Sequence, residues 1–175
     1  MKTVVVYKSK TGFTKKYAEW IAKDLSADLF EASKFKADSL VNYDTVIFGG
    51  SLHAAGIIGV KLIKKNLDKL KDKKVVVFST GASPARMEVL NEVKNRNFTE
   101  GEQNIIKFFY LRGGFDYSKL KSVDKVLMTM MKWKLKRKKK ETLTADERGM
   151  LASYNRPVDF TRKKYTEQLI SYVNS

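Results

Sequence analysis

Short apolar runs alternate with segments of helical spacing over the first two thirds of the chain. The apolar runs predict buried strands at residues 3–7, 28–32, 45–49, 74–79 and 105–111. Between the first two runs, apolar side chains recur along one helix face, at Tyr17, Trp20, Ile21 and Leu25. Similar spacing predicts helices over 60–70 and 87–95. Because strands separated by helices pair in parallel through right-handed crossovers, the pattern predicts an α/β fold with a five-stranded parallel sheet.

The alternation stops near residue 112 and a helical pattern returns only at 161–173. A stretch of about 45 residues is too long for an ordinary connection between a strand and a helix. We therefore expect a single domain over 1–175 with an insert at about 112–157 before the last helix. Inside the insert, apolar residues again follow helical spacing, at Val123, Val126, Leu127, Met130 and Met131.

The composition restricts the chemistry. Cysteine is absent, which excludes disulfides, thiolate catalysis and cysteine metal sites, and the single histidine, His53, disfavours a histidine zinc site. No apolar run approaches the roughly 18 residues of a membrane-spanning helix. Strand-forming residues follow Met1 almost directly, which leaves no room for a signal peptide. We therefore expect a cytoplasmic protein without a metal site.

The net charge is +16, from 35 Lys and Arg residues against 19 Asp and Glu. A positive field of this size favours anionic partners: a membrane surface, a nucleic acid, an acidic protein or a polycarboxylate ligand.

A loop rich in hydroxyl groups follows the first strand and opens the first helix. Its Gly12 permits a tight turn, and the end of a strand followed by a helix N-terminus is a common place for a phosphate. Neither the Walker A loop nor the dinucleotide fingerprint is present. The residues that we expect to hold a phosphate are Ser9, Lys10, Thr11, Gly12, Phe13 and Thr14. The alternative is an ordinary capped helix start with glycine in its turn.

This loop, Ser-Lys-Thr-Gly-Phe-Thr, resembles the flavodoxin phosphate loop Ser/Thr-x-Thr-Gly-x-Thr at every fixed position. Residues 42–51 and 74–79 are similar to the third and fourth strands of that family, and residues 51–56 and 80–83 to its two flavin loops. The resemblance covers roughly 1–111 and 158–175. It implies a flavodoxin-like fold with strand order 2-1-3-4-5 and one FMN bound non-covalently. The residues that it places beside the flavin are Ser51, Leu52, His53, Ala54, Gly56, Ser79, Thr80, Gly81 and Ala82.

The flavin loops depart from the family in one respect. Flavodoxins often stack the flavin between Trp and Tyr, whereas these loops carry no Trp, Tyr or Phe, and His53 is their only ring. His53 either contacts the flavin or transfers a proton during its reduction, or it is a polar loop residue without a chemical role. No general base or nucleophile stands out, as is typical of a flavin protein, so no catalytic residue is predicted.

The insert combines a Met- and Trp-rich apolar stripe with seven basic residues between positions 132 and 140. This combination is typical of an interfacial helix on an anionic membrane. The residues expected to bind a membrane or another anionic partner are Met130, Met131, Lys132, Trp133, Lys134, Lys136, Arg137, Lys138, Lys139 and Lys140. Two alternatives remain. The stripe packs on the domain's own sheet with the lysines solvated, or the basic run binds nucleic acid, although no nucleic-acid motif accompanies it.

The position, length and character of the insert resemble those of the flavodoxin-like menaquinone-dependent protoporphyrinogen oxidases. Residues 112–120 and 123–131 are similar to the start of their insert and 158–161 to its end, while 141–150 has no such counterpart. The resemblance implies an oxidoreductase that acts at the inner face of the membrane and passes electrons to a quinone. The alternative is an electron-transfer protein that docks an acidic redox partner through its basic insert.

Overall fold

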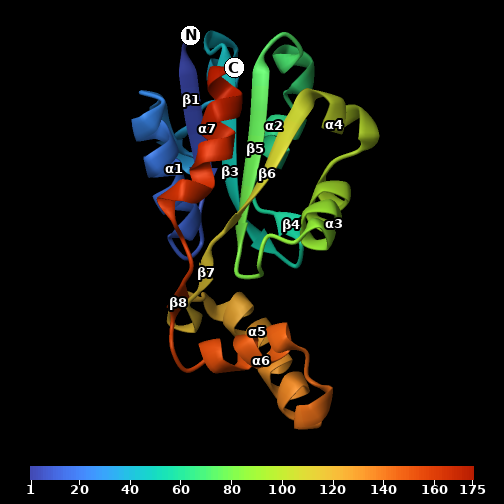
Figure 1. The fold of residues 1–175 in the computed structure, drawn as a ribbon. Coiled ribbons are helices and arrows are strands. Elements are labelled where there is room, and N and C mark those ends of the chain that lie inside the picture. Colours follow the sequence, from blue (N-terminus) through green and yellow to red (C-terminus); the bar gives the residue numbers. More distant parts are fainter.

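The computed structural model describes residues 1–175 apart from the side chain of Ser122. Its centre is a parallel sheet with the order β2-β1-β3-β5-β6 (Figure 1). The strands are β1 (Thr3–Lys8), β2 (Asp28–Glu31), β3 (Thr45–His53), β5 (Lys74–Gly81) and β6 (Ile106–Arg112). They correspond to the five predicted strands, and their order is the expected 2-1-3-4-5. The predicted flavodoxin-like fold is confirmed.

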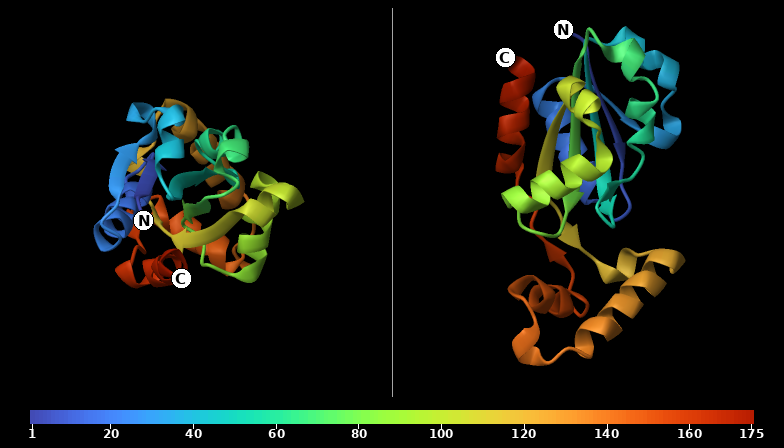
Figure 2. Two further views of the ribbon diagram at one scale, coloured as in Figure 1. Left: turned by 90° about the horizontal axis from the view of Figure 1, so that it is seen from above. Right: turned by 90° about the vertical axis from the view of Figure 1, so that its right-hand side faces the viewer.

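Helices cover both faces of the sheet (Figure 2). On one face, α1 (Phe13–Asp24) and α7 (Glu167–Asn174) pack on the alternate strand residues Val5, Ile47 and Val76. The other face is covered by α2 (Lys61–Lys64), α3 (Met87–Asn97) and α4 (Glu100–Ile105). Because both faces are buried, the central strands are continuous apolar runs, as a parallel sheet requires.

The predicted helix over 60–70 is wrong. The chain forms the short α2 and then a separate 3₁₀ turn over Leu67–Leu70. The side-chain amide of Asn66 donates to the Leu62 carbonyl, 2.8 Å away, and so takes the acceptor that the Asn66 backbone N–H needs to continue an α-helix. That N–H bonds Ile63 instead, 2.9 Å away, and the helix ends.

The predicted loop over 51–56 is a β-hairpin. Strand β3 runs on to His53 and pairs antiparallel with β4 (Gly56–Ile57). The two residues of its turn, Ala54 and Ala55, have φ of +47° and +63°, the left-handed backbone that a tight hairpin turn needs.

Two further helices differ from the prediction, one in its bounds and one in its existence. The last helix is shorter than 161–173, because a 3₁₀ turn over Lys163–Thr166 precedes α7. Helix α4 is not predicted at all, yet its start has a sequence signature, a capping box in which Thr99 and Glu102 bond each other's backbone N–H groups.

The insert extends beyond the carboxyl edge of the sheet, at the end opposite both termini (Figure 1). It leaves and returns through a two-stranded antiparallel ribbon, β7 (Gly114–Phe115) with β8 (Val158–Asp159). The ribbon carries α5 (Ser122–Lys136), which contains the predicted helical stripe, and α6 (Ala145–Ser153). No helix of the described residues is both long and apolar enough to span a bilayer.

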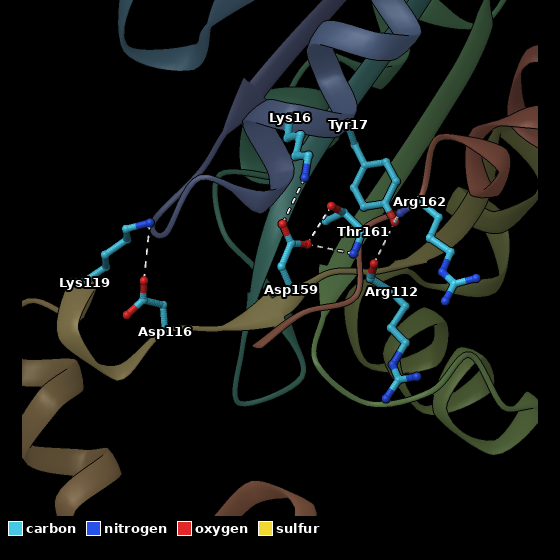
Figure 3. Close-up of polar contacts among 8 residues, drawn as sticks. All are labelled: Lys16, Tyr17, Arg112, Asp116, Lys119, Asp159, Thr161 and Arg162. Carbon is cyan, nitrogen blue, oxygen red and sulfur yellow. Dashed lines mark hydrogen bonds and ion pairs between the residues drawn. The ribbon is translucent and has the colours of Figure 1, made fainter. Parts of the chain in front are cut away.

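The buried Tyr17 of α1 joins the two ends of the insert (Figure 3). Its hydroxyl donates to the Arg112 carbonyl at 2.7 Å and accepts the Arg162 N–H at 3.2 Å. Arg112 ends β6, and Arg162 follows the ribbon on the way back to α7. Beside this contact, Lys16 pairs with Asp159 at 2.9 Å, and Asp159 accepts the N–H of Thr161 at 2.8 Å. Helix α1 therefore holds the base of the ribbon.

We predict that Tyr17→Phe lowers the free energy of unfolding by about 1–3 kcal/mol at pH 7, because it leaves the Arg112 carbonyl and the Arg162 N–H without their shared partner. Urea unfolding followed by circular dichroism measures the change. The control is Tyr165→Phe, whose hydroxyl makes no hydrogen bond among the described residues. Equal stability of the two variants would contradict the assigned contact.

The same variant alters the response to alkaline pH. Burial raises the pKa of Tyr17 to about 12, whereas a tyrosine in an unfolded chain ionises near pH 10. Between these values the unfolded state loses its proton first, so the stability of the protein falls as the pH rises from about 10 to about 12. Tyr17→Phe removes only part of this fall, because burial also raises the pKa of Tyr110 to about 12.

Candidate functional site

The carboxyl ends of β1, β3 and β5 meet the insert around a cavity of about 200 Å³. Three of its walls come from the sheet: the loop after β1, the β3–β4 hairpin and the end of β5. The fourth wall is the insert, which contributes the ribbon strand β7 and the first half of α5.

The loop after β1 forms a cradle of backbone N–H groups. Gly12 has φ of +97°, which glycine adopts without strain, and its N–H donates to the Ser9 hydroxyl at 3.1 Å. The next N–H groups open α1. Among the described residues no acceptor bonds the backbone N–H groups of Thr11, Phe13, Thr14 and Lys15. Four free donors at the positive end of a helix dipole match the oxygens of a phosphate.

A chain of hydroxyl groups joins the three sheet-derived walls from below. The fully buried Thr14 hydroxyl lies 2.8 Å from the Ser51 hydroxyl of β3 and 2.6 Å from the Thr80 hydroxyl of β5. Ser51 also accepts the N–H of Lys10 at 3.3 Å. One buried threonine thus sets the spacing of the phosphate loop and both flavin loops.

Asp124 of α5 ties the insert to the cradle. Its carboxylate lies 2.5 Å from the Lys10 ammonium and 3.4 Å from Nδ1 of His53. The hydrogen bond from Lys10 lowers the pKa of Asp124, so this carboxyl group is ionised at neutral pH. The two contacts place α5 across the mouth of the cavity.

Most of the predicted cofactor residues line this cavity: Lys10, Thr11, Phe13, Ser51, Leu52, His53, Ala54, Thr80, Gly81 and Ala82. The others lie behind it. Ser9, Gly12 and Thr14 shape the loop and its hydroxyl chain, and Gly56 lies in β4. Ser79 is fully buried in β5, and its hydroxyl has no partner among the described residues.

Sequence reasoning misses the insert's share of the wall: Gly114, Phe115, Asp116, Leu120, Asp124, Leu127 and Met128. One signal was present in the consecutive glycines 113 and 114. Gly114 lies against Phe13, and a Cβ there would meet the Phe13 ring at 2.7 Å. For Asp124 no local signal exists, because its partner Lys10 is 114 residues away.

The residues predicted to bind an anionic surface lie on α5 and just after it, outside the cavity. The apolar stripe does not pack on the sheet, since Val123, Met130 and Trp133 are 74%, 64% and 64% exposed. That alternative is therefore wrong. Leu135, on another face of the helix, is buried. The cations are partly engaged: Lys138 pairs with Glu147 at 2.6 Å, and Lys132 lies 5.1 Å from the centre of the Tyr154 ring.

Comparison with known families agrees with this geometry. The model of the flavodoxin domain matches residues 4–142. The chain belongs to the flavodoxin domain family. Members of this family bind FMN. The match extends through α5 into the insert.

The chain is similar to other proteins in sequence and in structure. An uncharacterized protein of Methanocaldococcus jannaschii is 33% identical over 106 residues, which cover 56% of this chain and 69% of that protein. Among solved structures, a Trp repressor binding protein from Bacillus subtilis has a TM-score of 0.47 at 17% identity and covers 64% of this chain and 83% of its own. The Megasphaera elsdenii flavodoxin has a TM-score of 0.45 at 19% identity, and the match covers 63% of this chain and 85% of the flavodoxin.

We predict that Thr14→Val lowers the free energy of unfolding by about 1–3 kcal/mol, because it keeps the side-chain shape but leaves two hydroxyl groups without their common partner. Thermal and urea unfolding measure the loss. The control is Thr11→Val in the same loop, whose hydroxyl makes no hydrogen bond among the described residues. If both variants lose the same stability, the hydroxyl chain does not brace this site.

Proposed function

We propose that this flavodoxin-family protein is an FMN-dependent oxidoreductase that resembles quinone-dependent protoporphyrinogen oxidase and acts at a membrane surface. The observation that carries the proposal is the enclosure of one cavity by both flavin loops and the insert. The loop after β1 indicates a flavin that carries a phosphate. The insert supplies a wall that limits the access of protein partners to the site.

The residues fit the proposed cofactor. The free N–H groups at positions 11 and 13–15 and the Lys10 ammonium hold the phosphate, and residues 51–54 and 80–82 flank the flavin ring. Bound FMN supplies the redox chemistry, taking electrons from a reduced substrate and giving them to an acceptor. The protein's own part is to orient the ring through the hydroxyl chain of Thr14 and to exclude water with α5.

We infer that the cavity widens when FMN binds. Small-molecule sites usually measure about 300–1,000 Å³, whereas this cavity measures about 200 Å³. The phosphate and Asp124 compete for the same Lys10 ammonium, so separation of the Lys10–Asp124 pair opens the mouth. Separating the Lys10–Asp124 pair costs little stability, because a partly exposed ion pair contributes about 1 kcal/mol or less.

Enclosure favours an enzyme over an electron carrier. A carrier must present its flavin edge to a protein partner, whereas here Leu120, Leu127 and Met128 line the cavity on the side of the insert. A small substrate that enters beside the insert suits this arrangement. The net charge of +16 favours an anionic substrate, such as a porphyrinogen that carries propionates.

The test has a binding arm and a turnover arm. The fluorescence of FMN should be quenched on binding. FMN should bind at least about tenfold more tightly than riboflavin, because riboflavin lacks the phosphate and its several charge-assisted hydrogen bonds. The FMN-loaded protein should then convert protoporphyrinogen to fluorescent porphyrin with a menaquinone analogue as acceptor, without oxygen.

Each arm can fail separately. Equal affinity for FMN and riboflavin contradicts the phosphate site. Tight FMN binding without porphyrin formation contradicts the enzyme and leaves the electron carrier as the better interpretation.

The outer face of α5 supports the membrane part of the proposal. Val123, Val126, Met130 and Trp133 form an exposed apolar row along the helix, and the basic cluster follows at its end. Apolar side chains enter the lipid boundary while lysines contact anionic headgroups, with about 1 kcal/mol for each basic residue near the surface. The competing partner, an acidic redox protein, would use the same cations.

We predict that the double variant Met130→Ser, Trp133→Ser pellets at least about tenfold less with vesicles that contain anionic phospholipid, because each apolar side chain contributes about 1.5–3 kcal/mol when buried. The control is Met87→Ser, since Met87 is equally exposed, at 66%, but lies on α3. Pelleting unchanged by the double variant removes the membrane contact and favours the acidic protein partner.

A further inference from the structure

A second cavity, of about 370 Å³, adjoins the candidate flavin site. It lies between the segment after β5 and α6, and it shares the lining residues Ala82 and Phe115 with the first cavity. Phe160, Gly149 and Met150 line other parts of it. Its volume falls in the range of about 300–1,000 Å³ that small-molecule sites occupy. The sharing of Ala82 and Phe115 means that a ligand in one cavity lies next to a ligand in the other.

One fixed cation faces this second cavity. The Nε of Arg112 donates to the Ala82 carbonyl at 3.2 Å, and its guanidinium lies 3.8 Å from the centre of the Phe160 ring. Figure 3 shows the side chain extending away from the Tyr17 contact that its backbone makes. Arg112 forms no ion pair among the described residues. A hydrogen bond and a contact with the Phe160 ring therefore hold the permanently charged Arg112 guanidinium in place without an anion.

The acidic groups around the cavity are already neutralised. Asp146 pairs with Arg86, and Glu147 pairs with Lys138 at 2.6 Å while it also caps α6 through the Thr144 N–H. The remaining lining is largely apolar, from Phe115, Met150, Val158 and Phe160. The cavity thus combines apolar and aromatic walls with one unpaired cation.

We propose that the second cavity binds a molecule with flat aromatic rings whose carboxylate pairs with Arg112. A guanidinium matches a carboxylate in a bidentate pair, and the aromatic walls match a flat ring system. An uncharged quinone would leave the cation unpaired, so we assign this cavity to a carboxylate-bearing substrate. That this cavity is the site of the electron donor rests on the proposed function. Binding of the carboxylate itself does not need FMN.

The experiment uses the full chain loaded with FMN and two matched probes, anthraquinone-2-carboxylate and anthraquinone-2-carboxamide, in equilibrium dialysis. We expect the carboxylate to bind at least about tenfold more tightly, because a charge-assisted pair replaces a neutral contact. Arg112→Gln should abolish the preference. Arg96→Gln, which makes the same change of net charge on α3, should retain it. Equal affinity for both probes, or equal losses in the two variants, overturns the assignment.

A second variant tests the cavity without touching the cation. Gly149 lies on α6 in the cavity wall, and a Cβ there meets no heavy atom within 4 Å. The Gly149→Phe variant should therefore fold, and its new side chain should fill the cavity and abolish binding of both probes. The fluorescence of FMN should still be quenched when FMN binds. Retained probe binding overturns the location.

The two proposals fail in different ways. If FMN binds but the protein shows no preference for the carboxylate, the second site is wrong and the flavin function stands. If the carboxylate preference and its loss in Arg112→Gln appear without FMN binding, the flavin function is wrong and the second site stands.

Discussion

The Tyr17 hydroxyl bonds the Arg112 carbonyl and the Arg162 N–H at once, and the insert is held at the sheet through this contact. Without it, the ribbon of β7 and β8 would be a two-stranded hairpin with little to support it. With it, the ribbon leaves the sheet beside the phosphate loop. Both candidate cavities lie where the ribbon and α5 or α6 face the strand ends. The site is therefore built from a common sheet and an insert whose base is fixed by the Tyr17 hydroxyl, the Lys16–Asp159 ion pair and the hydrogen bond from the Gly113 N–H to the Gly81 carbonyl.

Electrostatic pairing shapes what the insert can bind. Its acidic residues Asp124, Asp146 and Glu147 each pair with a cation, from the phosphate loop, from the segment before α3 and from the end of the basic run. These pairs position α5 and α6 and use up the negative charge near the cavities. The excess positive charge of the chain is left for phosphate, carboxylate or lipid headgroups. The three anion sites proposed here follow from the same imbalance.

The sheet could be predicted because its signals are local. Buried parallel strands are apolar on both faces, so Val4, Val5 and Val6 mark β1 without any knowledge of their neighbours. The errors arose where one side chain overrides a pattern. Asn66 ends a helix that the apolar spacing continues, and the β3–β4 hairpin depends on two alanines in left-handed backbone, a residue type that rarely indicates such a turn.

The sequence by itself determined the fold, the cradle after β1 and the basic, apolar insert, because patterns of neighbouring residues indicate each of them. Only the tertiary structure decided where the insert lies. It brought Asp124 to Lys10 and His53, exposed the stripe that Met130 and Trp133 belong to, and left Arg112 unpaired beside Phe160. The physical reason is distance along the chain. Contacts between residues far apart in the chain depend on how the ribbon is fixed to α1, and no periodicity or motif indicates that.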